Sequence, residues 1–215
     1  MEEKLLIDSI IFDVDGTLWD STDVVADAWN QIMEKETDMT PNLTGAVLKG
    51  LFGRLLPDIA AVIFHEYPKE RQLELIEACC AKEHEALLAT PAPVYPGLVD
   101  ALSILSRHYP LYIVSNCQAG YIEVFLEATG LGHYFKGHLC PGDTGKAKAD
   151  NIRTNRTICS TRSMSAIPTA TTRRHARPES RLSMPHTVLV RPKTRTTPSL
   201  SRWILSHCSY RKINF

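Results

Sequence analysis

Two aspartates, Asp13 and Asp15, stand two positions apart directly after an apolar run near the start of the chain. The run covers residues 5–12, is broken at only two positions and predicts a buried strand. Side chains at i and i+2 of an extended segment point the same way, so both carboxylates can address one site at the carboxyl end of the strand. Gly16 permits a tight turn there, and the Thr17 hydroxyl and nearby backbone N–H groups can bind an anion.

The stretch Asp13-Val14-Asp15-Gly16-Thr17 after an apolar strand resembles DxDGT, the first motif of the haloacid dehalogenase superfamily of phosphotransferases. The resemblance implies that Asp13 is the nucleophile, which takes the phosphoryl group as an aspartyl-phosphate. It also implies that Asp15 protonates the leaving alcohol and then activates water as a base. One carboxyl must be ionised, which bound Mg²⁺ favours, and the other must carry a proton.

A second polar pair follows another apolar stretch. Residues 109–114 look like a strand that ends in Ser115 and Asn116. This arrangement is similar to the family's second motif, in which a hydroxyl side chain at the strand end binds the phosphoryl oxygens. The resemblance implies that Ser115 holds the phosphate and that Asn116 helps to orient it.

The third motif of the family is a lysine at the start of a helix, which neutralises charge between nucleophile and phosphate. Lys148, followed by Ala149 and Asp150, is the first choice, and Lys146 is the alternative. The cofactor implied is Mg²⁺, bound by the Asp13 carboxylate and the backbone carbonyl of Asp15.

Between the first two motifs lies a helical insertion. Apolar residues at helical spacing predict helices over residues 21–35, 44–52, 57–64 and 71–88. The first is expected to be capped by Ser21-Thr22-Asp23, and a proline-rich linker precedes Leu98.

The resemblance implies an α/β fold, namely a three-layer Rossmann-like core with a parallel sheet and an inserted helical cap. The cap is like that of the phosphoglycolate phosphatase and β-phosphoglucomutase branch. We assign residues 1–19 and 92–153 to the core, 20–91 to the cap and 154–215 to a separate tail.

The tail differs from the rest of the chain in charge. Residues 1–153 hold 12 basic and 23 acidic residues, hence −11, whereas residues 154–215 hold 12 basic residues and one acidic residue, hence +11. The family's fourth motif, one or two further aspartates that complete the Mg²⁺ site, is absent because the tail contains no Asp. A basic tail without helical or strand periodicity is typical of a nucleic-acid-binding extension or of a disordered segment.

A third interpretation is that the tail is translated in the wrong reading frame. Shifting the frame permits YVGDTDGDYA over residues 163–173, AGIPF over 177–182 and AAYGFG over 184–190. These strings are similar to the missing strand, its aspartates and the strand that follows, in the order of the family. This interpretation is preferred, and the chain as written is then expected to have little or no activity.

Function and compartment follow from the same features. The protein is expected to be a Mg²⁺-dependent phosphatase whose partner is a small phosphorylated metabolite. The alternatives are a sugar phosphomutase with the same residues and a non-enzymatic nucleic-acid binder, which is less expected. No secretory signal or membrane span is expected, and six cysteines without CxxC spacing favour a reduced, cytoplasmic setting.

Overall fold

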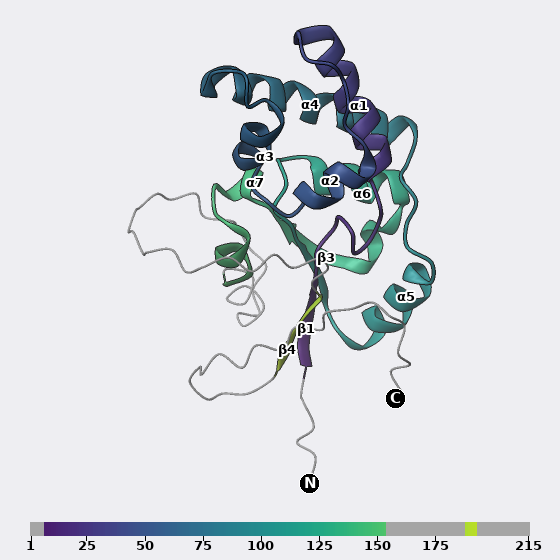
Figure 1. The fold of residues 1–215 in the computed structure, drawn as a ribbon. Coiled ribbons are helices and arrows are strands. Elements are labelled where there is room, and N and C mark those ends of the chain that lie inside the picture. The colour runs from purple at the N-terminus through teal and green to yellow at the C-terminus, as the bar shows by residue number, and fades with distance from the viewer. Residues whose placement is uncertain (1–6, 154–187, 193–215) are drawn as a thin grey trace.

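A four-stranded sheet lies at the centre of the computed structural model, which describes residues 7–153 and 188–192 (Figure 1). The strands, in the order β3-β2-β1-β4 across the sheet, are β1 (Ile7–Phe12), β2 (Leu111–Val114), β3 (Phe135–Leu139) and β4 (Val188–Pro192). β1 is parallel to β2, and β2 is parallel to β3, so these three strands have their carboxyl ends at one edge. The predicted α/β fold with a parallel sheet is confirmed.

The register between β1 and β2 determines which side chains meet at that edge. Phe12 lies opposite Ile113, so the chain leaves both strands at the same level. The residues that follow, Asp13 after β1 and Ser115 just beyond β2, are thereby placed next to each other.

Helices connect the strands of the core. They are α5 (Leu98–His108), α6 (Tyr121–Thr129), the 3-10 turn η1 (Leu131–Tyr134) and the short α7 (Pro141–Thr144). A further helical segment covers residues 148–153 and begins at Lys148, as the sequence predicted.

Four helices form the cap beyond the carboxyl edge of the sheet (Figure 1). They are α1 (Thr22–Glu36), α2 (Gly45–Leu51), α3 (Leu56–Ile63) and α4 (Lys69–Ala89). Each corresponds to a predicted helix within two residues at either end. α2 is capped by the Thr44 hydroxyl, which accepts a hydrogen bond from Val47 N at 3.3 Å, and α3 carries Pro57 in its first turn.

The two connections between cap and core run side by side. Asp20 N donates a hydrogen bond to the carbonyl oxygen of Pro93 at 3.0 Å, and Trp19 forms an antiparallel bridge with Val94. The cap is therefore an insertion that leaves and rejoins the core at one place.

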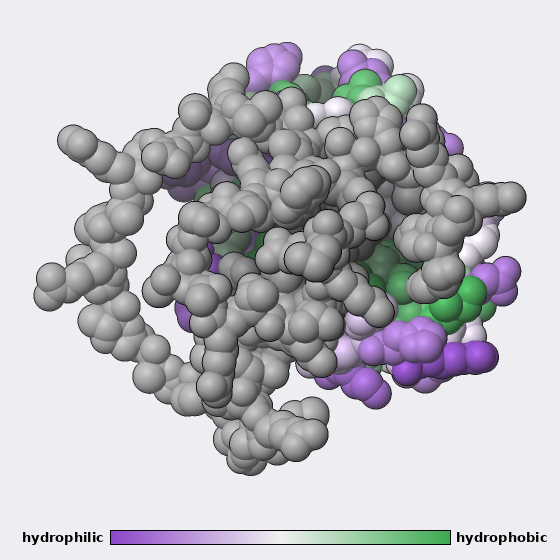
Figure 2. Space-filling view, turned by 90° about the horizontal axis from the view of Figure 1, so that it is seen from below, coloured by the Kyte–Doolittle hydropathy of each residue, from purple (hydrophilic) through white to green (hydrophobic). Residues whose placement is uncertain are grey.

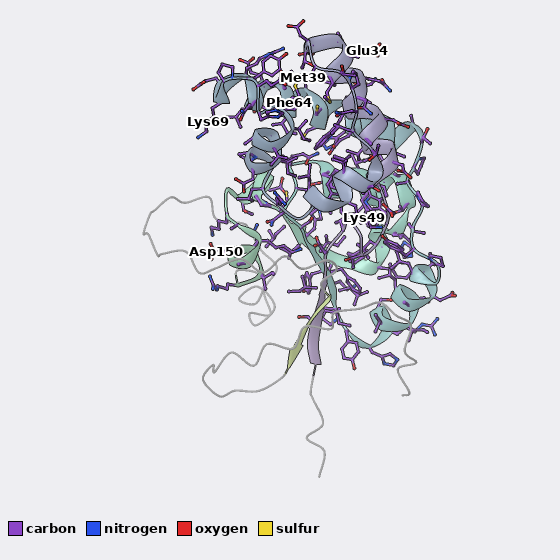
Figure 3. All side chains as sticks on the ribbon, in the orientation of Figure 1. Glu34, Met39, Lys49, Phe64, Lys69 and Asp150 are labelled. Atoms are coloured by element: carbon purple, nitrogen blue, oxygen red, sulfur yellow. The ribbon has the colours of Figure 1, made fainter. Side chains whose placement is uncertain are left out.

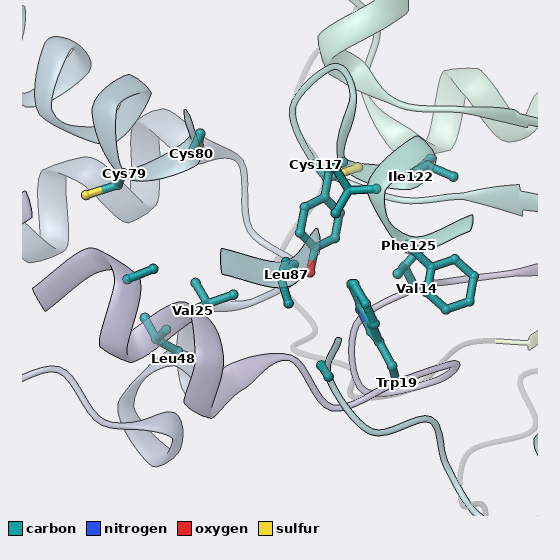
Figure 4. Close-up of a cluster of buried hydrophobic side chains, with 14 of the residues drawn as sticks. Val14, Trp19, Val25, Leu48, Cys79, Cys80, Leu87, Cys117, Ile122 and Phe125 are labelled. Carbon is teal, nitrogen blue, oxygen red and sulfur yellow. The ribbon is translucent and has the colours of Figure 1, made fainter. Parts of the chain in front are cut away.

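One apolar cluster runs from the core into the cap (Figure 4). Trp19 packs edge-on against Phe125 of α6, with ring centroids 5.0 Å apart. Leu48 of α2 and Leu87 of α4, both completely buried, belong to the same cluster. Because burial of one such side chain contributes about 1.5–3 kcal/mol, this cluster fixes the cap against the core.

The tail differs from expectation at five residues. Its composition predicted neither helix nor strand, yet Val188–Pro192 forms β4 and pairs antiparallel with β1. The two valines of this segment suit a strand, and the free edge of β1 offers unpaired backbone groups. The shifted-frame segments over 163–173 and 177–182 lie outside the described residues, as do 154–187 and 193–215 as a whole.

The surface of the described residues mixes polar and apolar side chains. Val99 and Ile104 of α5 are each almost half exposed, and Figure 2, seen from the end opposite the cap, shows hydrophobic next to hydrophilic surface at the right-hand edge. No helix among the described residues is long and apolar enough to cross a membrane.

Candidate active site

The carboxylate of Asp13 lies just beyond β1 and is held by two donors. Val14 N donates to Oδ1 at 3.0 Å, and Lys148 Nζ lies 2.5 Å from Oδ2. Both side chains of the ion pair are largely buried, with exposed fractions of 16% for Asp13 and 19% for Lys148. Lys146, the alternative lysine, is exposed. The geometry therefore favours Lys148 as the lysine of the third motif.

The turn after Asp13 reverses the chain at Gly16. Gly16 has φ 70°, in the left-handed region that favours glycine, and its N–H donates to the Trp19 carbonyl oxygen at 3.0 Å. Thr17, which was expected to bind phosphate, has a buried hydroxyl without a hydrogen-bond partner among the described residues, and it is absent from the cavity wall. Gly16 lines the cavity.

Asp15 is surrounded by hydroxyl and indole donors. Its Oδ1 accepts hydrogen bonds from Tyr121 OH at 2.5 Å, Ser21 Oγ at 2.8 Å and Trp19 Nε1 at 3.2 Å. Burial raises the pKa of Asp15 to about 6, although these three hydrogen bonds act in the opposite direction. A carboxyl with this pKa can exchange a proton near neutral pH.

The predicted helix cap at Ser21 is wrong in its chemistry. Ser21 occupies the N-cap position of α1, but its hydroxyl makes no capping hydrogen bond and donates to Asp15 instead. A hydroxyl caps a helix by accepting a hydrogen bond from a backbone N–H, whereas the Ser21 hydroxyl donates to the Asp15 carboxylate, whose charge strengthens the bond.

Ser115 and Asn116 lie beside Asp13, and both line the cavity. Ser115 is buried, with 4% of its surface exposed. Asn116 accepts a hydrogen bond from Lys148 N at 3.2 Å and donates one to the carbonyl oxygen of Gly53 in the cap at 2.9 Å. The side chain thus connects the second motif, the third motif and the cap.

Close packing of backbone against backbone supports the loop after β2. A Cβ atom on Gly142 would lie 1.9 Å from Ala119 N, so only glycine fits where the chain after β3 passes the loop after β2. Gly142 N also donates to the Cys117 carbonyl oxygen at 3.3 Å.

A cavity of about 120 Å³ opens between these groups and the cap. The cap contributes both apolar side chains and charged side chains to the cavity wall, and two of the charged ones are cations. Lys49 of α2, labelled in Figure 3 at the side of the cap that faces the core, lies 3.5 Å from Asp20. Arg54 is exposed at the rim. The arrangement suits a small anionic ligand whose phosphate faces the core.

Several polar residues of the cavity wall were not predicted from the sequence. Among them are Glu83 of α4, Gln118 after β2 and Tyr121 of α6. Glu83 is 3% exposed, and burial raises its pKa to about 8. The sequence did hold one indication that Glu83 is buried. Glu83 stands four residues after Cys79 and four before Leu87, in line with the apolar face of its helix.

The oxygen donors at Asp13 and Asp15 fit the expected cation. Mg²⁺ prefers carboxylate and carbonyl oxygens and is often held by one or two carboxylates together with substrate phosphate and water. The carboxylate of Asp13 and the backbone carbonyl of Asp15 would supply two ligands. A separate group, formed by Glu123, His138 and Asp143, has ligand atoms within 4.8 Å of one another but includes no residue of the cavity wall.

Comparison with solved structures agrees with this description. A hydrolase of the haloacid dehalogenase-like family from Streptococcus pneumoniae is 22% identical and has a TM-score of 0.60, covering 72% of this chain and 70% of that one. A predicted phosphatase from Clostridium acetobutylicum is 21% identical and has a TM-score of 0.58, and the match covers 72% of this chain and 71% of that one. A HAD-hydrolase from Bacillus subtilis bound to magnesium is 19% identical, with a TM-score of 0.50 and coverages of 70% and 74%.

At these identities the structures show a shared fold. Among curated protein sequences, no significant match is found. The family described as haloacid dehalogenase-like hydrolase matches residues 7–155, which is more than half of the chain and includes all three motifs. The chain belongs to the haloacid dehalogenase-like hydrolase family.

Proposed function

We propose that this protein is a Mg²⁺-dependent phosphatase that hydrolyses small phosphate monoesters through an aspartyl-phosphate on Asp13. The observation that carries the proposal is the ion pair between Asp13 and Lys148, at 2.5 Å, beside Ser115 and Asn116. Two separate stretches of sequence thus supply a nucleophile and phosphate-binding groups to one cavity, and a third supplies the lysine that pairs with the nucleophile. Membership of a hydrolase family and the similarity to a predicted phosphatase support it.

The first step forms a bond between an Asp13 oxygen and phosphorus, while the bond from phosphorus to the ester oxygen breaks. Asp15 donates its proton to that oxygen, so the leaving group departs as an alcohol. In the second step Asp15 takes a proton from water, the water oxygen attacks phosphorus, and the bond to Asp13 breaks. Inorganic phosphate is released and both carboxyl groups return to their first state.

Other side chains stabilise charge on the phosphoryl oxygens. Lys148, which is paired with Asp13, and the buried Ser115 would bind these oxygens, and Asn116 would orient them. Mg²⁺, when bound at Asp13 and the Asp15 carbonyl, would offset the negative charge between nucleophile and phosphate. The pKa of about 6 at Asp15 keeps part of the population protonated at neutral pH.

Phosphate release from a panel of small monoesters tests the proposal in a chain with the shifted frame restored. Asp13→Asn should lower the rate at least about 1,000-fold because the amide is a poor nucleophile. Asp27→Asn, at an exposed position of α1, is the matched control and should leave the rate within about twofold. Removal of Mg²⁺ by a chelator should abolish turnover.

Full activity of Asp13→Asn would refute the assigned nucleophile. Isomerisation of a sugar phosphate without release of phosphate would instead identify a phosphomutase that uses the same residues.

A further inference from the structure

Glu83 is a buried carboxyl in the cap-side wall of the cavity. Its Oε2 accepts a hydrogen bond from Trp29 Nε1 at 2.6 Å, and its Oε1 accepts one from the side-chain nitrogen of Gln118. Trp29 belongs to α1 and Gln118 to the core loop after β2, so groups from two other elements fix this carboxyl in place. Glu83 accepts both hydrogen bonds, and no described residue is found to accept one from it.

The surroundings of Glu83 favour its neutral form. Burial raises its pKa to about 8, so at neutral pH the carboxyl carries a proton. The titratable groups around the carboxyl are Asp15, Tyr121, Cys79, Cys80 and His84, the last through Gln118. None of these is a cation at neutral pH, because burial lowers the pKa of His84 below its ordinary value. The O–H of Glu83 is therefore available to a ligand in the cavity.

The position of Glu83 relative to the proposed chemistry determines which part of a substrate it meets. The phosphoryl group would lie at Asp13, on the core side, and the leaving group would extend toward the cap. The cap side of the cavity includes the apolar side chains of Phe52, Leu56 and Ile59. One water molecule takes up roughly 10–15 Å³ of cavity volume. The cavity of about 120 Å³ therefore accommodates a leaving group of only a few heavy atoms.

We propose that Glu83 is a specificity-determining residue that hydrogen-bonds a hydroxyl of the leaving group, so that the substrates are phosphate monoesters of short polyols. The inference rests on the proposed phosphatase function. A hydroxyl can accept from the neutral carboxyl, whereas an alkyl group would leave the buried O–H unpaired, which is unfavourable. A second anionic group placed at Glu83 would lie against a buried acid. Of the two cap cations that line the cavity, Lys49 is paired with Asp20, whereas Arg54 is exposed.

Binding of non-hydrolysable phosphonates to the full chain, measured by calorimetry with Mg²⁺ at pH 7, tests this proposal. The ligands are 3,4-dihydroxybutylphosphonate, butylphosphonate and 3-carboxypropylphosphonate. We expect the diol to bind at least about 10-fold more tightly than the alkyl compound, and more tightly than the carboxylate. A diol-to-alkyl affinity ratio near one, or tightest binding of the carboxylate, would overturn the proposal without recourse to any variant.

Substitutions assign the effect to Glu83. Glu83→Leu should bring the diol-to-alkyl ratio close to one while changing affinity for butylphosphonate less than about threefold. Because this change leaves two buried donors unpaired, Glu83→Asp serves as a second variant, which withdraws the carboxyl by one methylene and should also lower the ratio. Glu85→Gln, at an exposed position of the same helix, is the control and should leave the diol-to-alkyl affinity ratio unchanged.

The proposal is overturned if either variant folds and keeps the full ratio. Failure of inorganic phosphate and of all three phosphonates to bind the parent chain would contradict the proposed phosphate site itself. That result is distinct from equal binding of the diol and the alkyl compound, which contradicts only the role of Glu83.

Discussion

Replacing Glu83 with glutamine should remove a large pH dependence from the stability of the folded chain. The pKa of Glu83 is raised from 4.5 to about 8 by burial, so the folded chain keeps a proton that the unfolded chain releases above pH 4.5. The stabilisation from this proton is fully present below pH 4.5 and is lost as the pH rises through about 8. Glutamine has a similar shape and does not titrate.

The expected size follows from the two pKa values. Within the interval from 4.5 to about 8, the free energy of unfolding should fall by about 1.4 kcal/mol for each pH unit. From pH 5 to pH 8 the parent chain should therefore lose about 4 kcal/mol relative to Glu83→Gln. This is a large fraction of the total stability of an ordinary domain.

Urea unfolding of the parent and of Glu83→Gln at pH 5, 6, 7, 8 and 9 provides the measurement. Titratable groups that do not interact with Glu83 contribute equally to both chains, so the difference between the two free energies reports Glu83 together with its electrostatic coupling to neighbours such as Asp15 and Cys79. Glu85→Gln, on the solvent side of α4, should follow the parent at every pH.

A difference that stays constant from pH 5 to pH 9 would refute this reasoning. It would mean that the hydrogen bonds from Trp29 and Gln118 hold Glu83 ionised despite its burial. The carboxyl would then have no proton to offer a ligand at neutral pH.

Three further predictions concern the site and the tail. Lys148→Ala should lower phosphate release by the frame-restored chain at least about 100-fold, whereas Lys146→Ala should change it less than about twofold; equal losses would contradict the assignment of the third motif. Tyr121→Phe removes a hydroxyl 2.5 Å from Asp15 and should lower kcat/KM about 10-fold in steady-state kinetics with little change in the circular dichroism spectrum, because the ring keeps its contact with Trp19; unchanged kinetics would show that the hydroxyl is dispensable. Sequencing the coding DNA around codons 150–170 should show a shifted frame that encodes Gly-Asp, and stop codons in that frame would end the frameshift interpretation.

Local patterns were sufficient to predict β1, β2, the four cap helices and the positions of the motifs. An apolar run that ends in Asp13-Val14-Asp15-Gly16 indicates a strand followed by a turn, because strand burial and glycine conformation are local properties. Helical spacing of apolar residues likewise predicted all four cap helices. Parallel strands bring their carboxyl ends together, so the proximity of Asp13 to Ser115 follows from the order of the elements.

Tertiary structure alone decided which polar side chains join the site from a distance. Tyr121 reaches Asp15 across 106 positions of sequence, and Trp29 reaches Glu83 across 54. Neither contact has a local signature, since it depends on how α1, α4 and α6 pack around the carboxyl edge of the sheet. The raised pKa values of Asp15 and Glu83 share this origin: burial is a property of the assembled fold, whereas the sequence specifies only that a carboxyl is present.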